Sequence, residues 1–209
     1  MSLCLKLPDG QQAAIDLLRA GGVLIFPTET VYGIGASIEH PQGLEKLSII
    51  KQRPKNQPIS VLVSDLDMAL PLWELPSPQT HLLKSLGERY WPGPLTLIAP
   101  CREGISTVLT GGTGTLGIRI PQNLLLCSLI RELGGPLAAA SANRAGAPPA
   151  TRFIDASETL GHEVDGLIQG EDSLLGQAST VAQLLDGKIV VHREGAISNH
   201  ELQTAVRAL

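Results

Sequence analysis

The sequence predicts an α/β fold, in which helices lie on the faces of a mixed and largely covered sheet. The chain has 209 residues, of which 43% are hydrophobic, and this is enough for one core. Short apolar runs alternate with segments of helical periodicity over most of the length, a pattern typical of α/β proteins. No repeat, charge run or linker divides the chain, so we expect a single domain over residues 1–209.

Two helices are predicted in the first quarter of the chain. Asp9 and Gln12 have the spacing of a capping box, and apolar residues follow at helical intervals until a pair of glycines. Pro41 opens the second helix. That helix should end near Arg53, because Pro54 disfavours helical geometry at the residue before it.

Strands are predicted where a short apolar run is bounded by glycine, proline or polar residues. The first, VLIF (23–26), leads into a polar loop with two glycines, PTETVYGIG (27–35). The other predicted strands cover 59–63, 96–99, 116–120, 136–140, 166–169, 180–184 and 189–192. Polar segments rich in glycine and proline lie at the ends of these strands, where open α/β sheets bind ligands.

The later helices mostly carry recognisable start signals. A side chain that can accept a hydrogen bond from the first helical turn precedes each of them. These helices are one capped by Asn123 and ended by Gly134, one with Asp155 and Glu158 as its cap, and one with Ser198 and Glu201 as a capping box. A further helix is predicted over 78–90.

Charge and residue content exclude several classes of protein. The formal net charge is −4, from 16 basic and 20 acidic residues, so no global basic field indicates a nucleic-acid-binding protein. The three cysteines form no CxxC pair and the five histidines form no ligand pattern, so no metal site is predicted. The N-terminus does not resemble a signal peptide, and no apolar run approaches the ~20 residues of a bilayer span. We therefore expect a cytoplasmic protein that does not enter a membrane.

Two short motifs point to functions that their context does not support. Residues 112–117 spell GxGxxG, but this segment precedes a predicted strand instead of following one, so we interpret it as a turn at the rim of a site. Ser48 and Lys51 spell SxxK and residues 141–143 resemble SxN, which together suggest a serine acyl-enzyme. That interpretation lacks the KTG element, and Ser48 lies in the middle of a predicted helix.

A set of segments is more informative together than any one of them alone. Their order and spacing, from about residue 10 to 197, resemble those of the YrdC/TsaC family over nearly the whole chain. The segments are PTETVYGIG (27–35), KQRPKNQPI (51–59), WPGPLTLI (91–98), TLGIRIP (115–121), SANRAG (141–146), Ser179-Thr180-Val181 and His192-Arg193-Glu194-Gly195.

The resemblance implies a YrdC-like twisted open mixed sheet with a deep concave site. It also implies a nucleotidyltransferase that makes threonylcarbamoyl-AMP and pyrophosphate from L-threonine, bicarbonate and ATP. Mg²⁺ would arrive with ATP, with no tightly held metal or organic cofactor. Other proteins, the tRNA-modification transferases, would then pass the group to an adenosine of tRNA. The chain ends soon after Gly195, so we expect the short form without a C-terminal domain.

The resemblance also assigns residues to the substrates. Around threonine it places Thr30, Arg119, the backbone at Ala139, and Ser179. Around ATP it places Arg53, Gln57, Thr115, Ser141, Asn143, Pro149 and Arg193. Lys51 and Arg53 are the candidate catalytic residues.

The chemistry of this reaction agrees with those residue types. No protein nucleophile is needed, because the threonine amine attacks bicarbonate or CO₂ and the resulting carbamate attacks the α-phosphate of ATP. The reaction needs cations, hydroxyl and N–H groups, and exclusion of water from a labile mixed anhydride. Lys51, Arg53, Arg119 and Arg193 supply the cations, and arginine suits carboxylate and phosphate groups.

Three positions depart from the family pattern. Leu62 stands where longer members carry a histidine near threonine, which puts one substrate contact in doubt. Gln57 replaces a common asparagine, and Pro149 can offer only its backbone or packing.

Two other functions stay open. The first is a module that binds double-stranded RNA or tRNA, even weakly, through a basic stripe on the concave surface. The second is a paralogue that acts on another carbamoyl donor, as in the YrdC-like domain of hydrogenase maturation proteins. The acidic total charge favours the enzyme over the RNA-binding module. The stripe would consist of Lys51, Arg53, Lys55, Arg144, Arg152 and Arg193.

Overall fold

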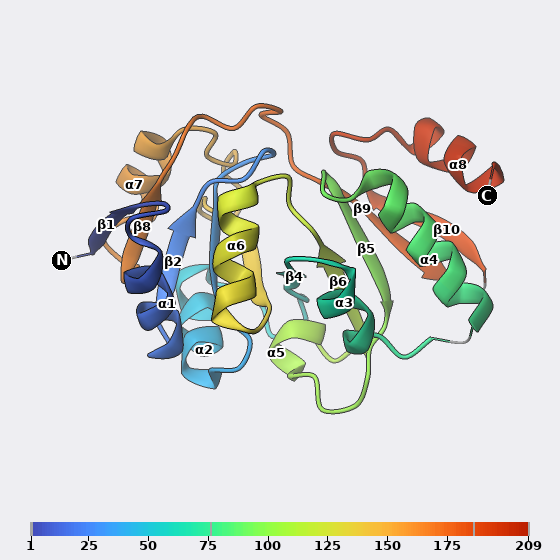
Figure 1. The fold of residues 1–209 in the computed structure, drawn as a ribbon, viewed down its shortest axis with the longest axis horizontal. Helices are drawn as coiled ribbons and strands as arrows, with labels where there is room; N and C mark the ends of the chain where they lie inside the picture. Colours follow the sequence, from blue (N-terminus) through green and yellow to red (C-terminus); the bar gives the residue numbers. More distant parts are fainter. Residues whose placement is uncertain (1, 76, 186, 209) are drawn as a thin grey trace.

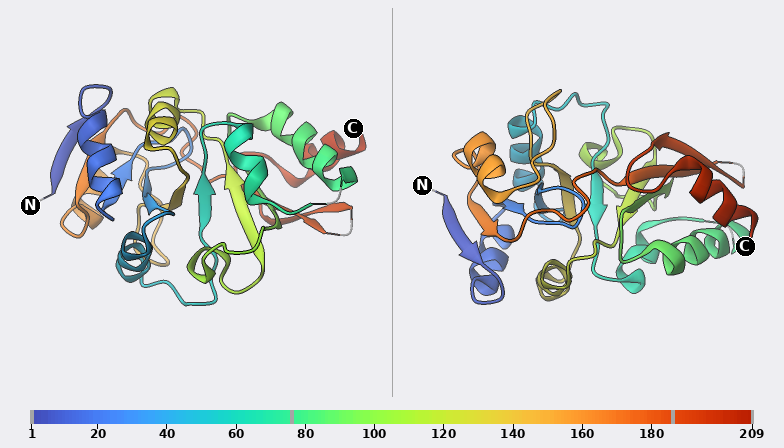
Figure 2. Two further views of the ribbon diagram at one scale, coloured as in Figure 1. Left: turned by 60° about the horizontal axis from the view of Figure 1, so that its bottom comes forward. Right: turned by 90° about the horizontal axis from the view of Figure 1, so that it is seen from above.

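The computed structural model describes residues 2–75, 77–185 and 187–208, and its centre is a ten-stranded mixed sheet (Figure 1). The strand order is β1-β8-β2-β3-β7-β4-β6-β5-β9-β10, so β1 and β10 form opposite edges of the sheet (Figure 2). Parallel and antiparallel pairs are interspersed, as the predicted α/β class requires. The strands are β1 (Leu3–Lys6), β2 (Val23–Phe26), β3 (Gly33–Ser37), β4 (Ser60–Leu62), β5 (Leu95–Pro100), β6 (Thr115–Arg119), β7 (Leu137–Ser141), β8 (Gly166–Gln169), β9 (Thr180–Leu185) and β10 (Lys188–Arg193).

Helices cover the two faces of the sheet unequally. On one face, α1 and α6 pack against Leu24, Phe26 and Leu137. On the other face, α2, α4, α7 and α8 contribute to a larger core that includes Ile25 and Val61. On the face that carries α1 and α6, the described helices therefore leave β4, β6, β5 and β9 uncovered. The helices are α1 (Gln11–Arg19), α2 (Pro41–Ile50), α3 (Leu66–Ala69), α4 (Ser77–Tyr90), α5 (Thr107–Thr110), α6 (Leu124–Leu133), α7 (Phe153–Leu160) and α8 (Asn199–Arg207), with a 3₁₀ turn over Leu70–Leu72.

All eight strands predicted from apolar runs are present, with small shifts at their ends. The predicted polar loop over 27–35 was partly wrong, because Gly33 and Gly35 belong to β3. A Cβ at Gly35 would lie 2.2 Å from the carbonyl oxygen of Ala138 on β7. Glycine at these positions therefore allows neighbouring strands to approach closely. From composition alone the segment had been interpreted as a loop.

Two predicted helix starts were wrong. The N-cap of helix α1 is Gly10, which makes no side-chain hydrogen bond, so Asp9 does not cap the helix. The reason is that an unpredicted strand, β1, leads directly into the turn before the helix. Helix α7 follows Arg152 without a side-chain cap, because the Asp155 carboxylate is paired with the Arg152 guanidinium at 2.6 and 2.8 Å. The caps predicted at Asn123 and Ser198 are confirmed.

Helix α2 ends three residues earlier than predicted. Lys51 is its C-cap, and Gln52 has a left-handed φ of 47°, which ends the helix before Pro54 can act. Lys51 therefore closes the helix while Arg53 lies in the loop beyond it. The short helices α3 and α5 were not predicted, since four residues give too little periodicity to recognise.

Candidate functional site

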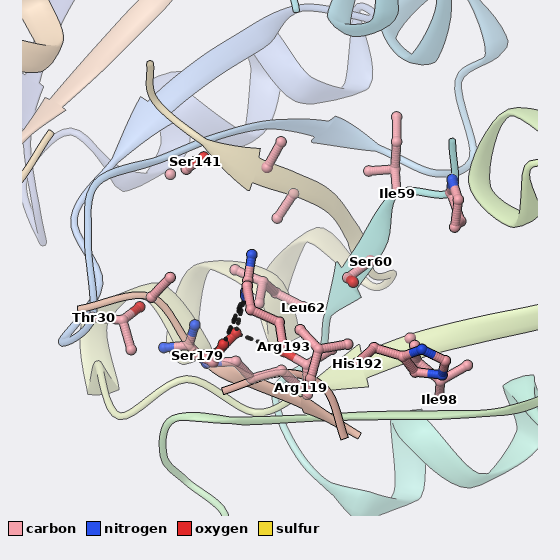
Figure 3. Close-up of a pocket in the computed structure, with 18 of the residues that line it drawn as sticks. Thr30, Ile59, Ser60, Leu62, Ile98, Arg119, Ser141, Ser179, His192 and Arg193 are labelled. Atoms are coloured by element: carbon pink, nitrogen blue, oxygen red, sulfur yellow. Dashed lines mark hydrogen bonds between the residues drawn. The ribbon is translucent and has the colours of Figure 1, made fainter. Parts of the chain in front are cut away.

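A cavity of about 480 Å³ lies on the uncovered part of the sheet (Figure 3). Successive side chains of a strand point to opposite faces, so alternate residues form the cavity floor. The intervening residues, such as Val61 and Ile118, belong to the core on the opposite side. The floor consists of Ser60 and Leu62 of β4, Thr96 and Ile98 of β5, Thr115, Gly117 and Arg119 of β6, Ala139 and Ser141 of β7, and Val181 and Gln183 of β9.

Gly117 leaves space above the middle of the cavity floor because it has no side chain. A Cβ at that position would come within 2.8 Å of Ser60 Oγ and 3.3 Å of Thr96 Cγ2. The missing side chain leaves room for a ligand group between β4 and β5.

Hydroxyl groups gather at one end of the cavity, where Figure 3 shows Thr30 and Ser179 together. Thr28 Oγ1 lies 2.8 Å from Thr30 Oγ1 and donates to the carbonyl of Val31 at 2.6 Å. A hydroxyl has one proton, so Thr30 must be the donor to Thr28, and its lone pairs face a ligand as acceptors. Ser179 Oγ lies 2.9 Å from Thr96 Oγ1.

Arg119 lies beside these hydroxyls and is held from two sides. It is 6% exposed, and its Nη2 donates to Glu29 Oε1 at 2.7 Å while its Nε donates to the Gly93 carbonyl at 3.0 Å. Burial lowers the pKa of Arg119, and the Glu29 carboxylate partly opposes this shift. The remaining guanidinium donors are available to a ligand, as in a carboxylate site.

Arg53 and Arg193 carry positive charge that no carboxylate of the described residues pairs with. Arg193 donates through Nε and Nη2 to the Ser179 carbonyl at 3.1 and 2.9 Å, and Arg53 donates to the carbonyls of Gln57 and Pro58. Neither forms an ion pair with any residue that the structure describes.

Burial is the main influence on the pKa values of these two arginines, and neighbouring positive charge adds to it. Burial lowers the pKa of Arg53, with a further contribution from Arg193, and burial lowers the pKa of Arg193, with a further contribution from Arg119. Arg53, Arg119 and Arg193 all line the cavity, so three positive charges that repel one another lie on one surface. A bound anion would relieve this repulsion.

Lys51 lies behind the cavity wall and does not line it. Its ammonium group donates to the carbonyl of Ser141 at 2.7 Å, to the carbonyl of Asn143, and to Asn143 Oδ1 at 3.2 Å. Burial, followed by the charges of Arg53 and Arg144, lowers the pKa of Lys51 to about 8. Asn143 Oδ1 in turn accepts from Ser141 Oγ at 2.5 Å, so Lys51 and Asn143 together orient Ser141.

Most of the candidate residues come together on this one cavity. Lys51, Asn143 and Pro149 do not belong to its lining, and the first two reach it only through Ser141. Leu62, the departure from the family pattern, is also in the wall. The candidates in the lining are Thr30, Arg53, Gln57, Thr115, Arg119, Ala139, Ser141, Ser179 and Arg193.

Several lining residues were not predicted. Ser60 and Thr96 lie within apolar strands, and the alternation of their strands was the signal that could have found them. His192 is different, because the register of β9 and β10 shifts between Val191 and Arg193. This bulge brings both His192 and Arg193 to the cavity although they are adjacent in sequence.

The first half of the GxGxxG segment, residues 112–114, forms the turn that its context predicted, and residues 115–117 already belong to β6. Gly112 and Gly114 have φ values of 81° and 70°, and Thr113 lines the cavity. Its place before a strand, with no helix after it, differs from that of a dinucleotide-binding loop.

The donor set of the cavity suits anions better than bare metal ions. Over residues 2–75, 77–185 and 187–208, no group of three or more His, Cys, Asp or Glu side chains could hold a metal. The same described residues include no helix long and apolar enough to cross a membrane.

Comparisons with known proteins agree with the motifs. A Bacillus subtilis (strain 168) protein named threonylcarbamoyl-AMP synthase is 37% identical over 200 residues, which cover 95% of this chain and 57% of that protein. An Idiomarina loihiensis protein of the same name is 32% identical over 181 residues, covering 86% of this chain and 94% of that protein. The crystal structure of Pyrococcus abyssi Sua5 complexed with L-threonine superposes with a TM-score of 0.88 at 29% identity, covering 98% of this chain and 60% of that one.

The chain thus spans little more than half the length of the B. subtilis relative and nearly all of the I. loihiensis relative. The family model Sua5_yciO_yrdC, described as "Telomere recombination", matches residues 16–195. The predicted resemblance is confirmed by these matches, and the chain belongs to the Sua5/YciO/YrdC family.

Proposed function

We propose that this chain is an L-threonylcarbamoyladenylate synthase that forms threonylcarbamoyl-AMP and pyrophosphate from L-threonine, bicarbonate and ATP. The observation that carries the proposal is the division of the cavity. A hydroxyl-rich end at Thr30 and Ser179 adjoins Arg119, and a cationic region without carboxylates holds Arg53 and Arg193. The two regions meet at Arg193, which donates to the carbonyl and to Oγ of Ser179. The names of the B. subtilis and I. loihiensis relatives support the same activity, and the latter matches this chain over 94% of its length. We also propose that residues 1–209 form one domain, because β1 and β10, which lie near opposite ends of the chain, belong to one sheet.

The hydroxyl-rich end is the proposed threonine site. Arg119 would bind the carboxylate, and Thr30, Ser179 and the backbone at Ala139 would bind the polar groups of the amino acid. Leu62 would contact the methyl group. The structure of P. abyssi Sua5 complexed with L-threonine supports a threonine site in this fold.

The cationic region is the proposed ATP site. Arg53 and Arg193 would bind the phosphates, with Gln57, Thr115 and Ser141 as hydrogen-bonding partners. Asn143 would act by orienting Ser141, and Pro149 by packing or its backbone. No carboxylate belongs to the cavity lining among the described residues, so Mg²⁺ would be held chiefly by the phosphates of ATP and by water.

The proposed reaction balances without a covalent enzyme intermediate. The threonine amine adds to bicarbonate with loss of water, giving a carbamate. A carbamate oxygen then forms a bond to the α-phosphorus as the bond to pyrophosphate breaks. Arg193 and Arg53 would stabilise the charge that develops on the phosphates, which is electrostatic catalysis by preorganised donors. The product would be used in the cytoplasm by tRNA-modification transferases.

A basic stripe for RNA has less support from the observed contacts. Arg144 is paired with Glu163, and Arg152 is paired with Asp155, so two of its six members are already neutralised. Lys51 is buried and directed at backbone carbonyls. We therefore favour small anionic ligands over an RNA backbone for this surface.

Pyrophosphate release is expected to require both threonine and bicarbonate. The measurement is pyrophosphate released from ATP by the purified chain, with each substrate omitted in turn and in CO₂-depleted buffer. An additional reaction with carbamoyl phosphate in place of bicarbonate tests the paralogue, and addition of tRNA tests the RNA module. ATP turnover that ignores threonine, or that needs carbamoyl phosphate, would contradict the proposed function.

Lys51→Met is expected to weaken binding of a non-hydrolysable ATP analogue about three- to tenfold, on the scale of one net hydrogen bond. The methionine keeps the apolar stem but removes the donors that hold Ser141 and Asn143. Calorimetric titration should give a threonine affinity close to that of the wild type. An unchanged affinity for the analogue would show that the segment holds its position without Lys51.

A further inference from the structure

Glu29 is a buried carboxylate that belongs to the polar loop after β2 and immediately precedes Thr30. It is 5% exposed and does not line the main cavity. Its Oε1 accepts from Arg119 Nη2 at 2.7 Å, and its Oε2 accepts from the backbone N–H of Gln122 at 3.0 Å. Its backbone carbonyl accepts from Leu175 N at 2.9 Å.

These contacts join three segments that are far apart in sequence. The loop after β2, the connection between β6 and α6, and the segment between β8 and β9 all meet at Glu29. In Figure 1 these segments lie at the same end of the sheet. Thr30 and Ser179 lie in two of these segments, and Arg119 ends β6 directly before the third. All three residues belong to the proposed threonine site.

Burial of such an ion pair is not by itself a gain in stability. The cost of removing both charges from water is comparable to their attraction, so a structural role alone would be served as well by apolar residues. The Glu29 carboxylate does something that an apolar residue cannot do. Together with the Gly93 carbonyl it fixes the plane of the Arg119 guanidinium, which leaves the other donors directed at the cavity.

We propose that Glu29 is a positioning residue for the α-carboxylate of the amino acid. Its carboxylate accepts hydrogen bonds from Arg119 and from the backbone of Gln122, and Thr30 is the next residue in the chain. Glu29 therefore fixes the position of the Arg119 guanidinium relative to the Thr30 hydroxyl. Glu29 also offsets the charge of Arg119, while Arg53 and Arg193 have no carboxylate partner among residues 2–75, 77–185 and 187–208. The Arg119 end then suits a zwitterionic amino acid, and the other end suits a polyphosphate. This inference rests on the proposed function.

Two substitutions test the bridge. Glu29→Gln keeps the shape but has one acceptor where two are needed, and Glu29→Asp keeps the charge but is one methylene too short to reach both partners. Each is expected to raise the threonine dissociation constant at least fivefold, measured by calorimetry, and to change that of a non-hydrolysable ATP analogue less than twofold. The matched control is Asp165→Asn, because the Asp165 carboxylate also pairs with a cation, Lys46, and accepts from a backbone N–H, that of Val23, away from the cavity. It should leave both constants unchanged.

A double-substitution cycle tests whether Glu29 acts through Arg119. Arg119→Gln should itself weaken threonine binding, and adding Glu29→Gln should cause little further loss. Fully additive losses, equal losses for threonine and the ATP analogue, or unchanged threonine binding in both Glu29 variants would overturn the inference. If the wild-type chain binds no threonine, the proposed function fails and this inference fails with it. If only the Glu29 variants behave as wild type, the proposed function stands.

Discussion

Arg53→Ala and Arg193→Ala are each expected to lower the rate of pyrophosphate formation by more than tenfold while the fold is retained. Each removes a guanidinium whose charge has no carboxylate partner within the described chain. A charge-assisted contact to a phosphate is worth roughly 1.5–3 kcal/mol, which corresponds to a loss of about ten- to 150-fold. The loss should appear in kcat/KM for ATP.

Neither variant loses an ion pair within the described chain, which sets them apart from substitutions of paired charges. Each loses only the hydrogen bonds that its guanidinium donates to backbone carbonyls. A small decrease in the thermal unfolding midpoint is therefore expected, with the fold retained. Arg131→Ala is a suitable control, because Arg131 is exposed on α6 and its contact with Asp65 is 3.6 Å long. Near-wild-type kinetics for both cavity variants would show that ATP binds elsewhere.

Eight of the ten strands could be predicted from sequence because each is a short apolar run with clear boundaries, whereas β1 and the glycine-containing β3 were not predicted. What could not be predicted is which strands become neighbours. β1 pairs with β8, and β5 pairs with β9, across long stretches of chain. The side-by-side placement of Thr96 and Ser179, whose hydroxyls lie 2.9 Å apart, follows from the second of these pairs and from no local signal.

The candidate site was predictable to the extent that its residues lie in recognisable motifs. Residue type alone could not separate a lining residue from one behind the wall. Lys51 and Arg53 are two positions apart, yet only Arg53 lines the cavity, because Lys51 caps α2 and turns toward the carbonyls of Ser141 and Asn143. Glu29 was not among the predicted site residues, because a carboxylate is unexpected beside a site that binds anions. Its pairing with Arg119 depends on a contact across 90 residues.

The direction of hydrogen bonds around Thr30 refines what that residue can do. Because Thr28 donates to the Val31 carbonyl, Thr30 must donate to Thr28, and Thr30 Oγ1 then presents only lone pairs to a ligand. It is therefore suited to the amine or hydroxyl of threonine and poorly suited to the carboxylate. Arg119 is the complementary donor for that carboxylate.

Serine should bind more weakly than threonine to the wild-type chain. It lacks one methyl group, and Leu62, a buried wall residue of the cavity, is the candidate partner for that methyl. Burial of one such group is worth only about 1 kcal/mol, so the preference should be close to fivefold and no more than tenfold. The polar contacts at Arg119, Thr30 and Ser179 would then provide most of the affinity for the amino acid.

Thr30→Val should raise the apparent threonine requirement by about five- to 150-fold and leave the ATP requirement nearly unchanged. Thr30 is 1% exposed, so valine keeps its shape and removes only the hydroxyl. The buried ligand donor is then left unpaired, which costs about 1–3 kcal/mol. Thr159→Val is the matched control, because Thr159 Oγ1 bonds the Asp155 carbonyl within α7 and does not line the cavity. Calorimetric titration of threonine and of a non-hydrolysable ATP analogue into both variants measures the difference. Unchanged threonine affinity with weakened nucleotide affinity in Thr30→Val would reverse the assignment of the two ends of the cavity, since Thr30 and Arg119 would then belong to the nucleotide.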